Sequence, residues 1–147
     1  MEENNIWKNF SFNEEEQKSA KDFLDEFKAG LTEQTGGELR LLVEVSDAYI
    51  EEEPVRLAAV YKLFVEAPKL GNFRRKILTV TEHSDTGRFP VDIYNNFSET
   101  PLKGINEEEF KLTIERILDS RIVKTSIENL YRRSKEYNKQ KELVDMD

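Results

Sequence analysis

The chain has 147 residues, of which 37% are hydrophobic and 35% are charged, and it contains no cysteine. A chain of this length can bury roughly 70% of its unfolded surface, which is enough for one hydrophobic core and argues against global disorder. The missing cysteines exclude a disulfide framework and a thiolate metal site. No apolar stretch approaches the roughly 20 residues that span a bilayer, and the first residues do not resemble a signal peptide. We therefore expect a soluble cytoplasmic protein without membrane association.

The net charge of −8 is unevenly distributed along the chain. Residues 1–53 hold 5 basic and 15 acidic side chains, a balance of −10, whereas residues 54–147 hold 17 basic and 15 acidic ones, a balance of +2. An acidic protein repels phosphate backbones at long range, so nucleic acid is not an expected partner, although a local basic site remains open. The acidic half suits a basic partner protein, or it serves solubility.

A first helix is predicted in the segment "EEEQKSAKDFLDEFKAG" after Asn13. Asn13 with Glu16 forms a capping-box pattern, and Gly30 is placed to end the helix. Apolar residues recur at helical spacing and form the buried stripe, which comprises Ala20, Phe23, Leu24, Phe27 and Leu31. The aromatic residues Trp7, Phe10 and Phe12 precede the helix, and we expect them to fold back onto the same core or onto a partner.

Four segments with alternating apolar and polar residues follow, which is typical of half-buried strands. They are residues 38–46, 55–67, 73–83 and 88–94, and the acidic segment "DAYIEEEP" is expected to separate the first two. The short connections between them favour an antiparallel meander. Pro90 has no amide hydrogen, which predicts an edge strand or the start of a strand.

Two helices are predicted after the strands. Asn106 with Glu109 repeats the capping pattern before a stripe of Phe110, Ile114, Ile117 and Leu118. Residues 119–120 end this helix and begin the next, whose inward residues are Val123, Ile127, Leu130, Tyr131 and Tyr137. We therefore predict one α+β domain over residues 1–137, in the order α-β-β-β-β-α-α. It consists of an antiparallel four-stranded meander sheet with one face covered by an N-terminal helix and two C-terminal helices, and the polar residues 138–147 fray.

The opposite face of this sheet is expected to be open. Its charged residues are predicted to be Arg56, Lys62, Glu66, Arg74, Lys76 and Glu82. Apolar side chains lie between them, Val60 and Phe64 on the second strand and Leu78 and Val80 on the third. Two apolar rows among charges are typical of a binding surface or a homodimer interface, unless a further helix covers them.

The only histidine, His83, comes directly before the turn-forming residues "SDTG". The favoured interpretation is a hairpin turn. A histidine oriented by Asp85 could instead act as a general base, and if the protein is an enzyme, His83 is its expected acid or base. The carboxylates stand out in three consecutive runs, Glu14–Glu16, Glu51–Glu53 and Glu107–Glu109, which do not converge on one ion, so we expect no metal and no other cofactor.

The sequence favours a non-catalytic cytosolic protein-interaction module, of the size and charge of immunity proteins, antitoxins and secretion chaperones. It would bind a protein partner, or a second copy, through the outer sheet face and the acidic N-terminal half. One alternative is a small-anion or nucleotide-binding protein in which Arg74, Lys76, His83 and Arg88 meet an anion at the sheet end. A further alternative is an RNA-binding α/β module. A second basic group lies on the last helix and could bind phosphate or an acidic protein, or balance the acidic first helix; it comprises Arg132, Arg133, Lys135 and Lys139.

Overall fold

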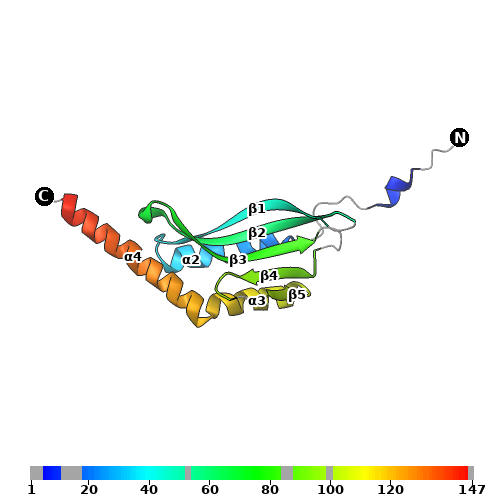
Figure 1. Ribbon diagram of the computed structural model, residues 1–147. Coiled ribbons are helices and arrows are strands. Elements are labelled where there is room, and N and C mark those ends of the chain that lie inside the picture. Colours follow the sequence, from blue (N-terminus) through cyan, green and yellow to red (C-terminus); the bar gives the residue numbers. More distant parts are fainter. Residues whose placement is uncertain (1–4, 11–17, 52–53, 84–87, 99–100, 146–147) are drawn as a thin grey trace.

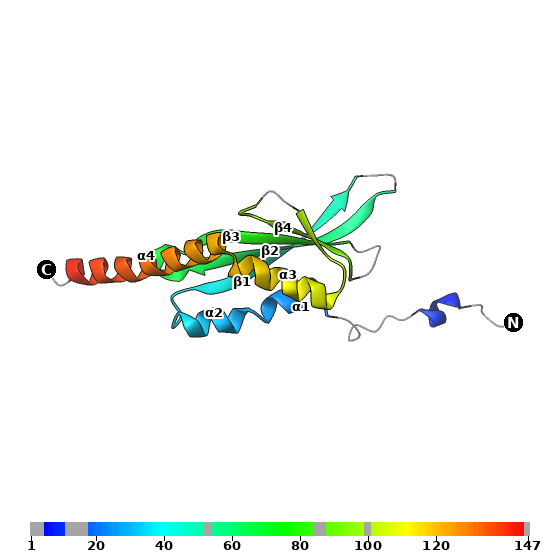
Figure 2. The same ribbon diagram turned by 90° about the horizontal axis from the view of Figure 1, so that it is seen from below.

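The computed structural model describes residues 5–10, 18–51, 54–83, 88–98 and 101–145 (Figure 1). Its strands form one antiparallel sheet in the order β1-β2-β3-β4-β5. All the helices that pack on this sheet lie on the same face, as Figures 1 and 2 show. The α+β class and the antiparallel meander are therefore confirmed, with a fifth strand added. The elements in chain order are η1 (Ile6–Asn9), α1 (Ala20–Asp25), α2 (Lys28–Gln34), β1 (Arg40–Ile50), β2 (Arg56–Ala67), η2 (Pro68–Leu70), β3 (Phe73–His83), β4 (Val91–Asn95), β5 (Pro101–Gly104), α3 (Glu107–Asp119) and α4 (Arg121–Asp145).

The first predicted helix is present but is divided into α1 and α2. A capping box begins α1, because the Ser19 hydroxyl accepts a hydrogen bond from the Asp22 amide and the Asp22 carboxylate accepts one from the Ser19 amide. The predicted cap of Asn13 with Glu16 lies outside the described residues.

The prediction that Gly30 ends this helical region is wrong. Gly30 lies inside α2, which continues to Gln34. The turn into β1 is instead made by Gly36 and Gly37, whose φ angles of 58° and 85° lie in the left-handed region that glycine tolerates best.

The cap of α3 is confirmed, because the Asn106 side chain accepts a hydrogen bond from the Glu109 amide at 2.8 Å.

The core lies between the helices and the sheet. The predicted stripes of all three helical regions contribute to this core, except that Tyr137 remains 40% exposed. The helix α4 continues through residues 138–145, for which fraying was predicted. Among the largest fully buried side chains are Phe23, Leu24, Leu63, Ile77, Leu78, Ile93, Phe110 and Ile114.

The sheet differs from the prediction at both of its edges. The fifth strand, β5, pairs with β4, so β4 is not an edge strand, and Pro90 stands just before the first residue of β4. At the other edge, β1 continues past Ser46 to Ile50 because the first four residues of the acidic segment, 47–50, find partners on β2, ending with Ile50 opposite Arg56. The β1–β2 hairpin therefore extends beyond the helices, and its end exposes apolar side chains on the helix-facing side, namely Val45, Tyr49 and Leu57.

Trp7 and Phe10, near the start of the chain, do not join the core. Trp7 is 62% exposed and Phe10 is 51% exposed, and η1 stands away from the body in both views (Figures 1 and 2). Their rings contact each other, with centroids 5.1 Å apart. Phe12 lies outside the described residues. Within the described residues, no helix is both long enough and apolar enough to cross a membrane.

Two glycines give opposite predictions for the same substitution. A Cβ atom at Gly104 would meet the Phe110 Cα at 3.1 Å and Cβ at 3.0 Å, whereas a Cβ atom at Gly30 would meet nothing within 4 Å. We expect Gly104→Ala to lower the free energy of unfolding by about 1–3 kcal/mol through overpacking. Gly30→Ala should raise it by about 0.5–1 kcal/mol, because alanine is the better helix former. Urea denaturation of both variants checks this, and equal effects would contradict the close packing of β5 against α3.

Candidate functional site

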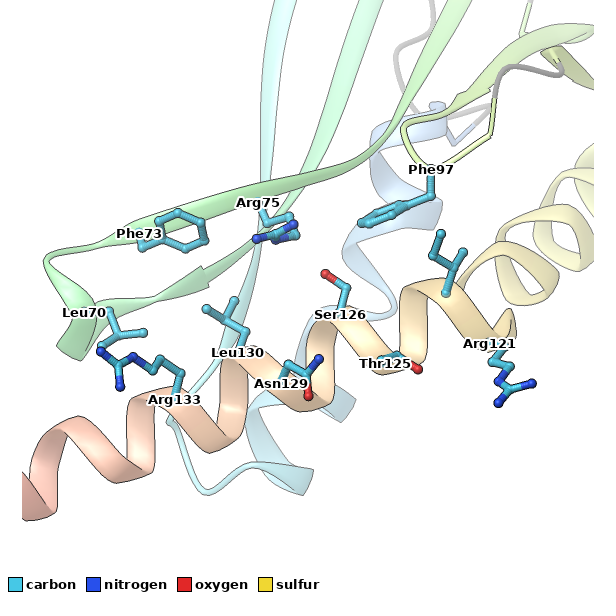
Figure 3. A pocket seen from close by; sticks show the side chains of 11 residues that line it. Leu70, Phe73, Arg75, Phe97, Arg121, Thr125, Ser126, Asn129, Leu130 and Arg133 are labelled. Atoms are coloured by element: carbon cyan, nitrogen blue, oxygen red, sulfur yellow. The ribbon is translucent and has the colours of Figure 1, made fainter.

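A cleft lies on the helix side of the sheet, between the N-terminal half of α4 and the start of β3 (Figure 3). Its volume is about 930 Å³. From the sheet side, Phe73 and Arg75 point toward α4, and Phe97 from the segment after β4 closes one end (Figure 3). From the helix side, Ser126 and Leu130 point toward the sheet (Figure 3). The remaining lining residues are Leu70, Arg121, Ile122, Thr125, Asn129 and Arg133.

The cleft combines an apolar interior with cationic groups. Arg75 lies over the Phe73 ring, with its guanidinium carbon 5.7 Å from the ring centroid. Arg133 and Leu70 both line the cleft, and Arg121 has its side chain directed outward (Figure 3). Among the described residues that line the cleft, none is acidic. Arg133 forms an ion pair with Glu136 at 3.8 Å, but both side chains are more than half exposed, so this pair neutralises Arg133 only weakly.

A buried carboxylate holds α4 in the position that forms the cleft. The Glu38 side chain is 5% exposed and accepts hydrogen bonds from Lys69 at 2.8 Å and from Ser134 at 2.6 Å. Asn138 also donates to Glu38, at 3.3 Å. The hydrogen bonds from Lys69 and Ser134 lower the pKa of the Glu38 carboxyl, and this effect exceeds the opposite effect of burial. Glu38, two residues before β1, therefore ties α4 to η2, which together form one end of the cleft.

The predicted outer sheet face is open, but it is less apolar than the sequence indicated. Val60, Lys62 and Phe64 are on this face and are partly buried. Within the described part of the chain, no helix covers this face, because the helices lie on the other side of the sheet (Figure 1). Leu78 and Val80 were predicted to lie beside them, and that prediction is wrong, because both are fully buried under the helices.

A β-bulge explains this difference. Leu63 pairs with Leu78 and Phe64 pairs with Lys76, so Ile77 is an extra residue on β3. Strict alternation from Lys76 would send Leu78 outward, but one extra residue moves every later side chain to the other face. The same shift turns Glu82, also predicted on the outer face, toward the helices, where it is buried and accepts hydrogen bonds from Arg88 at 2.7 Å and from the Ala20 amide at 3.1 Å.

The four residues that were predicted to meet one anion do not come together. Arg74 and His83 stand nine positions apart on β3, which is roughly 30 Å along a strand. Arg74 bonds to Glu66 at 2.7 Å, and Arg88 is paired with Glu82. Lys76 is partly buried opposite Phe64, on the outer face with Arg74. These positions contradict a shared anion site at the sheet end.

His83 contacts an aspartate other than the one considered from the sequence. Its Nε2 atom lies 2.6 Å from the Asp92 carboxylate on β4, and both side chains are partly exposed. Asp85 lies outside the described residues. Among the residues that the structure describes, no group of three or more His, Asp or Glu side chains is arranged to hold a metal ion.

The sequence contained part of the signal for the cleft. Arg133 was noted in the basic group on the last helix. Arg75 pairs with Val65, which places it on the helix-facing side of β3, the opposite face from Arg74. Ile122 was not identified from the sequence. It is an apolar residue that is 55% exposed, and it lines the cleft together with Arg121 and Thr125.

Fold and cleft together define an α+β protein with a five-stranded antiparallel meander, helices on one face, and a cationic apolar cleft under the last helix. Comparisons with protein-family models, with curated proteins and with solved structures find no significant match to this chain.

Proposed function

We propose that this chain is a non-catalytic protein-interaction module whose cleft binds an acidic, apolar segment of a partner protein. The observation that carries the proposal is the composition of the cleft, which joins apolar side chains to three arginines and, among the described lining residues, no carboxylate. Guanidinium groups favour carboxylates because they can donate two parallel hydrogen bonds to one acid. An occupant must therefore be apolar along its length and must carry acidic groups near both ends.

The length of the cleft favours a helix of about three turns as the occupant. Arg121, Thr125, Asn129 and Arg133 follow one another at intervals of four residues, so they lie along one face of α4. Twelve residues of helix measure roughly 18 Å. A partner helix laid along α4 would place its apolar face against Ile122 and Leu130 and its acidic residues near the terminal arginines.

A pair of designed peptides tests this proposal. One is a labelled amphipathic helix with glutamates at both ends, and the other has the same apolar residues with lysines in place of the glutamates. We expect only the acidic peptide to bind, as measured by fluorescence anisotropy. Arg133→Glu should weaken its binding about tenfold, or about 1.4 kcal/mol, because the exposed charge contacts of Arg133 with the peptide glutamates are lost and replaced by repulsion. Lys139→Glu is the matched control, since it makes the same charge change on α4 outside the cleft lining. Equal binding of both peptides would contradict the proposal.

A small amphipathic anion is the second candidate occupant, because a volume of about 930 Å³ falls within the range of small-molecule sites. Dodecyl phosphate would place its chain among Leu70, Phe73 and Phe97 and its phosphate near Arg75. A thermal-shift series with dodecyl phosphate, inorganic phosphate and ATP separates the two candidates by mass action. Stabilisation by dodecyl phosphate together with no binding of the acidic peptide would favour a small ligand.

A further inference from the structure

The end of the β1–β2 hairpin carries the chemistry that the cleft requires of its occupant. This hairpin end comprises residues 45–51 and 55–57. On its helix-facing side, Val45, Tyr49 and Leu57 are 51%, 73% and 42% exposed. Asp47 and Glu51, which are also exposed, stand two positions before and two positions after Tyr49. Exposed apolar side chains grouped in this way mark an interaction site.

The helix-facing side of the hairpin end is acidic as well as apolar. Asp47 shares this side with Tyr49, because alternate residues of a strand point to the same face. No ion pair joins Asp47 or Glu51 to another of the described residues. The single basic residue of the hairpin end, Arg56, lies on the outer face, where it pairs with Ile50. The three arginines of the cleft therefore attract the helix-facing side of the hairpin end.

We propose that the hairpin end of one copy occupies the cleft of a second copy, so that the chain forms a homodimer. This inference rests on the proposed function of the cleft, and it names a second copy of this chain as the partner. Tyr49 and Leu57 would lie among the apolar side chains of the cleft, and Asp47 and Glu51 would face its arginines. A two-stranded ribbon can take the place of a helix in such a cleft, since the major groove of DNA, about 12 Å wide, accepts either one.

The hairpin end lies far from the sheet side of its own cleft. Leu57 stands eight positions before Val65 on β2, and Val65 pairs with Arg75, which lines the cleft. Eight positions measure roughly 26 Å along a strand. Phe73 is further away still, because it pairs with Ala67.

The end of the cleft that Phe97 closes is nearer, but the hairpin end does not reach it either. Phe97 follows the residue whose amide donates a hydrogen bond to the Ile77 carbonyl at 2.9 Å. Ile77 is the bulge residue of β3, beside the partner of Leu63. Leu63 stands six positions from Leu57, which is roughly 20 Å along β2. Because β1 and β2 remain paired to the last residue of β1, the hairpin end is held extended, and a second copy must supply the cleft.

Two copies placed side by side and antiparallel bring each hairpin end to the cleft of the other copy. Figure 1 shows the end of the β1–β2 hairpin at one end of the sheet and η2, which borders the cleft, at the other. The same contact is then made twice around a two-fold axis. This arrangement gives a closed dimer and not an open fibre.

Sedimentation equilibrium of the full chain tests the inference. As the concentration rises from nanomolar to tens of micromolar, we expect the mass to rise from 17.3 kDa toward twice that value. Added salt should weaken the association, because exposed charge pairs are screened. The designed acidic peptide binds the same cleft, so an excess of it should return the mass to that of the monomer.

Variants of each side locate the contact. Asp47→Arg in the hairpin end and Arg133→Glu in the cleft should each raise the dissociation constant of the dimer about tenfold or more, because the dimer contains the altered contact twice. The matched controls are Ser46→Arg, on the opposite face of β1, and Lys139→Glu, outside the cleft lining; both should leave the constant unchanged. Far-ultraviolet circular dichroism confirms that each variant is folded.

A mixing experiment distinguishes a contact between these two surfaces from two unrelated effects. An equimolar mixture of Asp47→Arg and Arg133→Glu regains one unaltered contact in each mixed dimer, and its second contact joins the new arginine to the new glutamate. The mixture should therefore associate more strongly than either variant alone. Equal association of the mixture and the single variants would overturn the inference.

The remaining outcomes separate this inference from the proposed function. A monomeric mass over the whole concentration range overturns the inference. A dimer that survives both variants, or that the bound peptide does not dissociate, uses another surface and overturns it too. If the chain stays monomeric but binds the designed acidic peptide, the inference fails while the proposed function of the cleft stands.

Discussion

Phe110→Ala is expected to lower the free energy of unfolding by about 3–5 kcal/mol, the range found when a fully buried phenylalanine is truncated. Phe110 is 0% exposed at the start of α3. Its ring lies 6.0 Å from that of Phe23 on α1 and 6.1 Å from that of Phe89 before β4. Truncation therefore loses contacts to two other parts of the chain at once and leaves a cavity that the close backbone of Gly104 cannot fill.

The matched control for this prediction is Leu112→Ala, two residues further along the same helix. Leu112 is 44% exposed, so we expect its truncation to change the free energy of unfolding by less than about 1 kcal/mol. Guanidinium chloride denaturation measures both values. Because native domains are stable by only about 5–15 kcal/mol, Phe110→Ala should shift the transition midpoint strongly. Similar midpoints for the two variants would contradict the position of α3 against α1.

The sequence predicted most of the fold because the pattern of apolar residues determines which face of each element is buried. The stripe on α3, from Phe110 to Leu118, and the alternation on β2 both lie as expected. The fifth strand was missed because Pro101–Gly104 is only four residues long, with a proline at one end and a glycine at the other, and so lacks an alternating pattern. Its hydrogen bonds to β4, not its side chains, define it.

The candidate site was harder to predict, since it depends on contacts between distant segments. The bulge at Ile77 cannot be read from alternation, because an extra residue looks the same as any other until the partner strand is known. It removes Leu78 and Val80 from the predicted outer surface. The cleft likewise requires the position of α4, which is determined by bonds from Ser134 and Lys69 to Glu38, residues that are 96 and 31 positions away from it.

A second buried carboxylate gives the remaining prediction. The Glu66 side chain is 1% exposed and is bonded to Arg40 and Arg74, whose side chains are about half exposed. Burial alone would raise the pKa of Glu66, but the two arginines together lower it below its usual value near 4.5. Removing both arginines leaves a buried carboxylate without these two partners, a change that typically costs about 3–5 kcal/mol. Removing the carboxylate leaves two arginines that water can solvate.

We therefore expect the double variant Arg40→Met, Arg74→Met to be much less stable at pH 7 than Glu66→Met, and the triple variant to recover most of the loss. The pH dependence should also change sign. In the wild type, the lowered pKa of Glu66 stabilises the folded protein at pH values above about 4.5. This stability is lost as the pH falls through the pKa that Glu66 has in the folded state. In the double variant burial raises that pKa, so the contribution is present at low pH and is lost as pH rises. Urea denaturation between pH 3 and pH 8 measures both slopes, and parallel curves for wild type and double variant would show that the arginines do not compensate the buried charge.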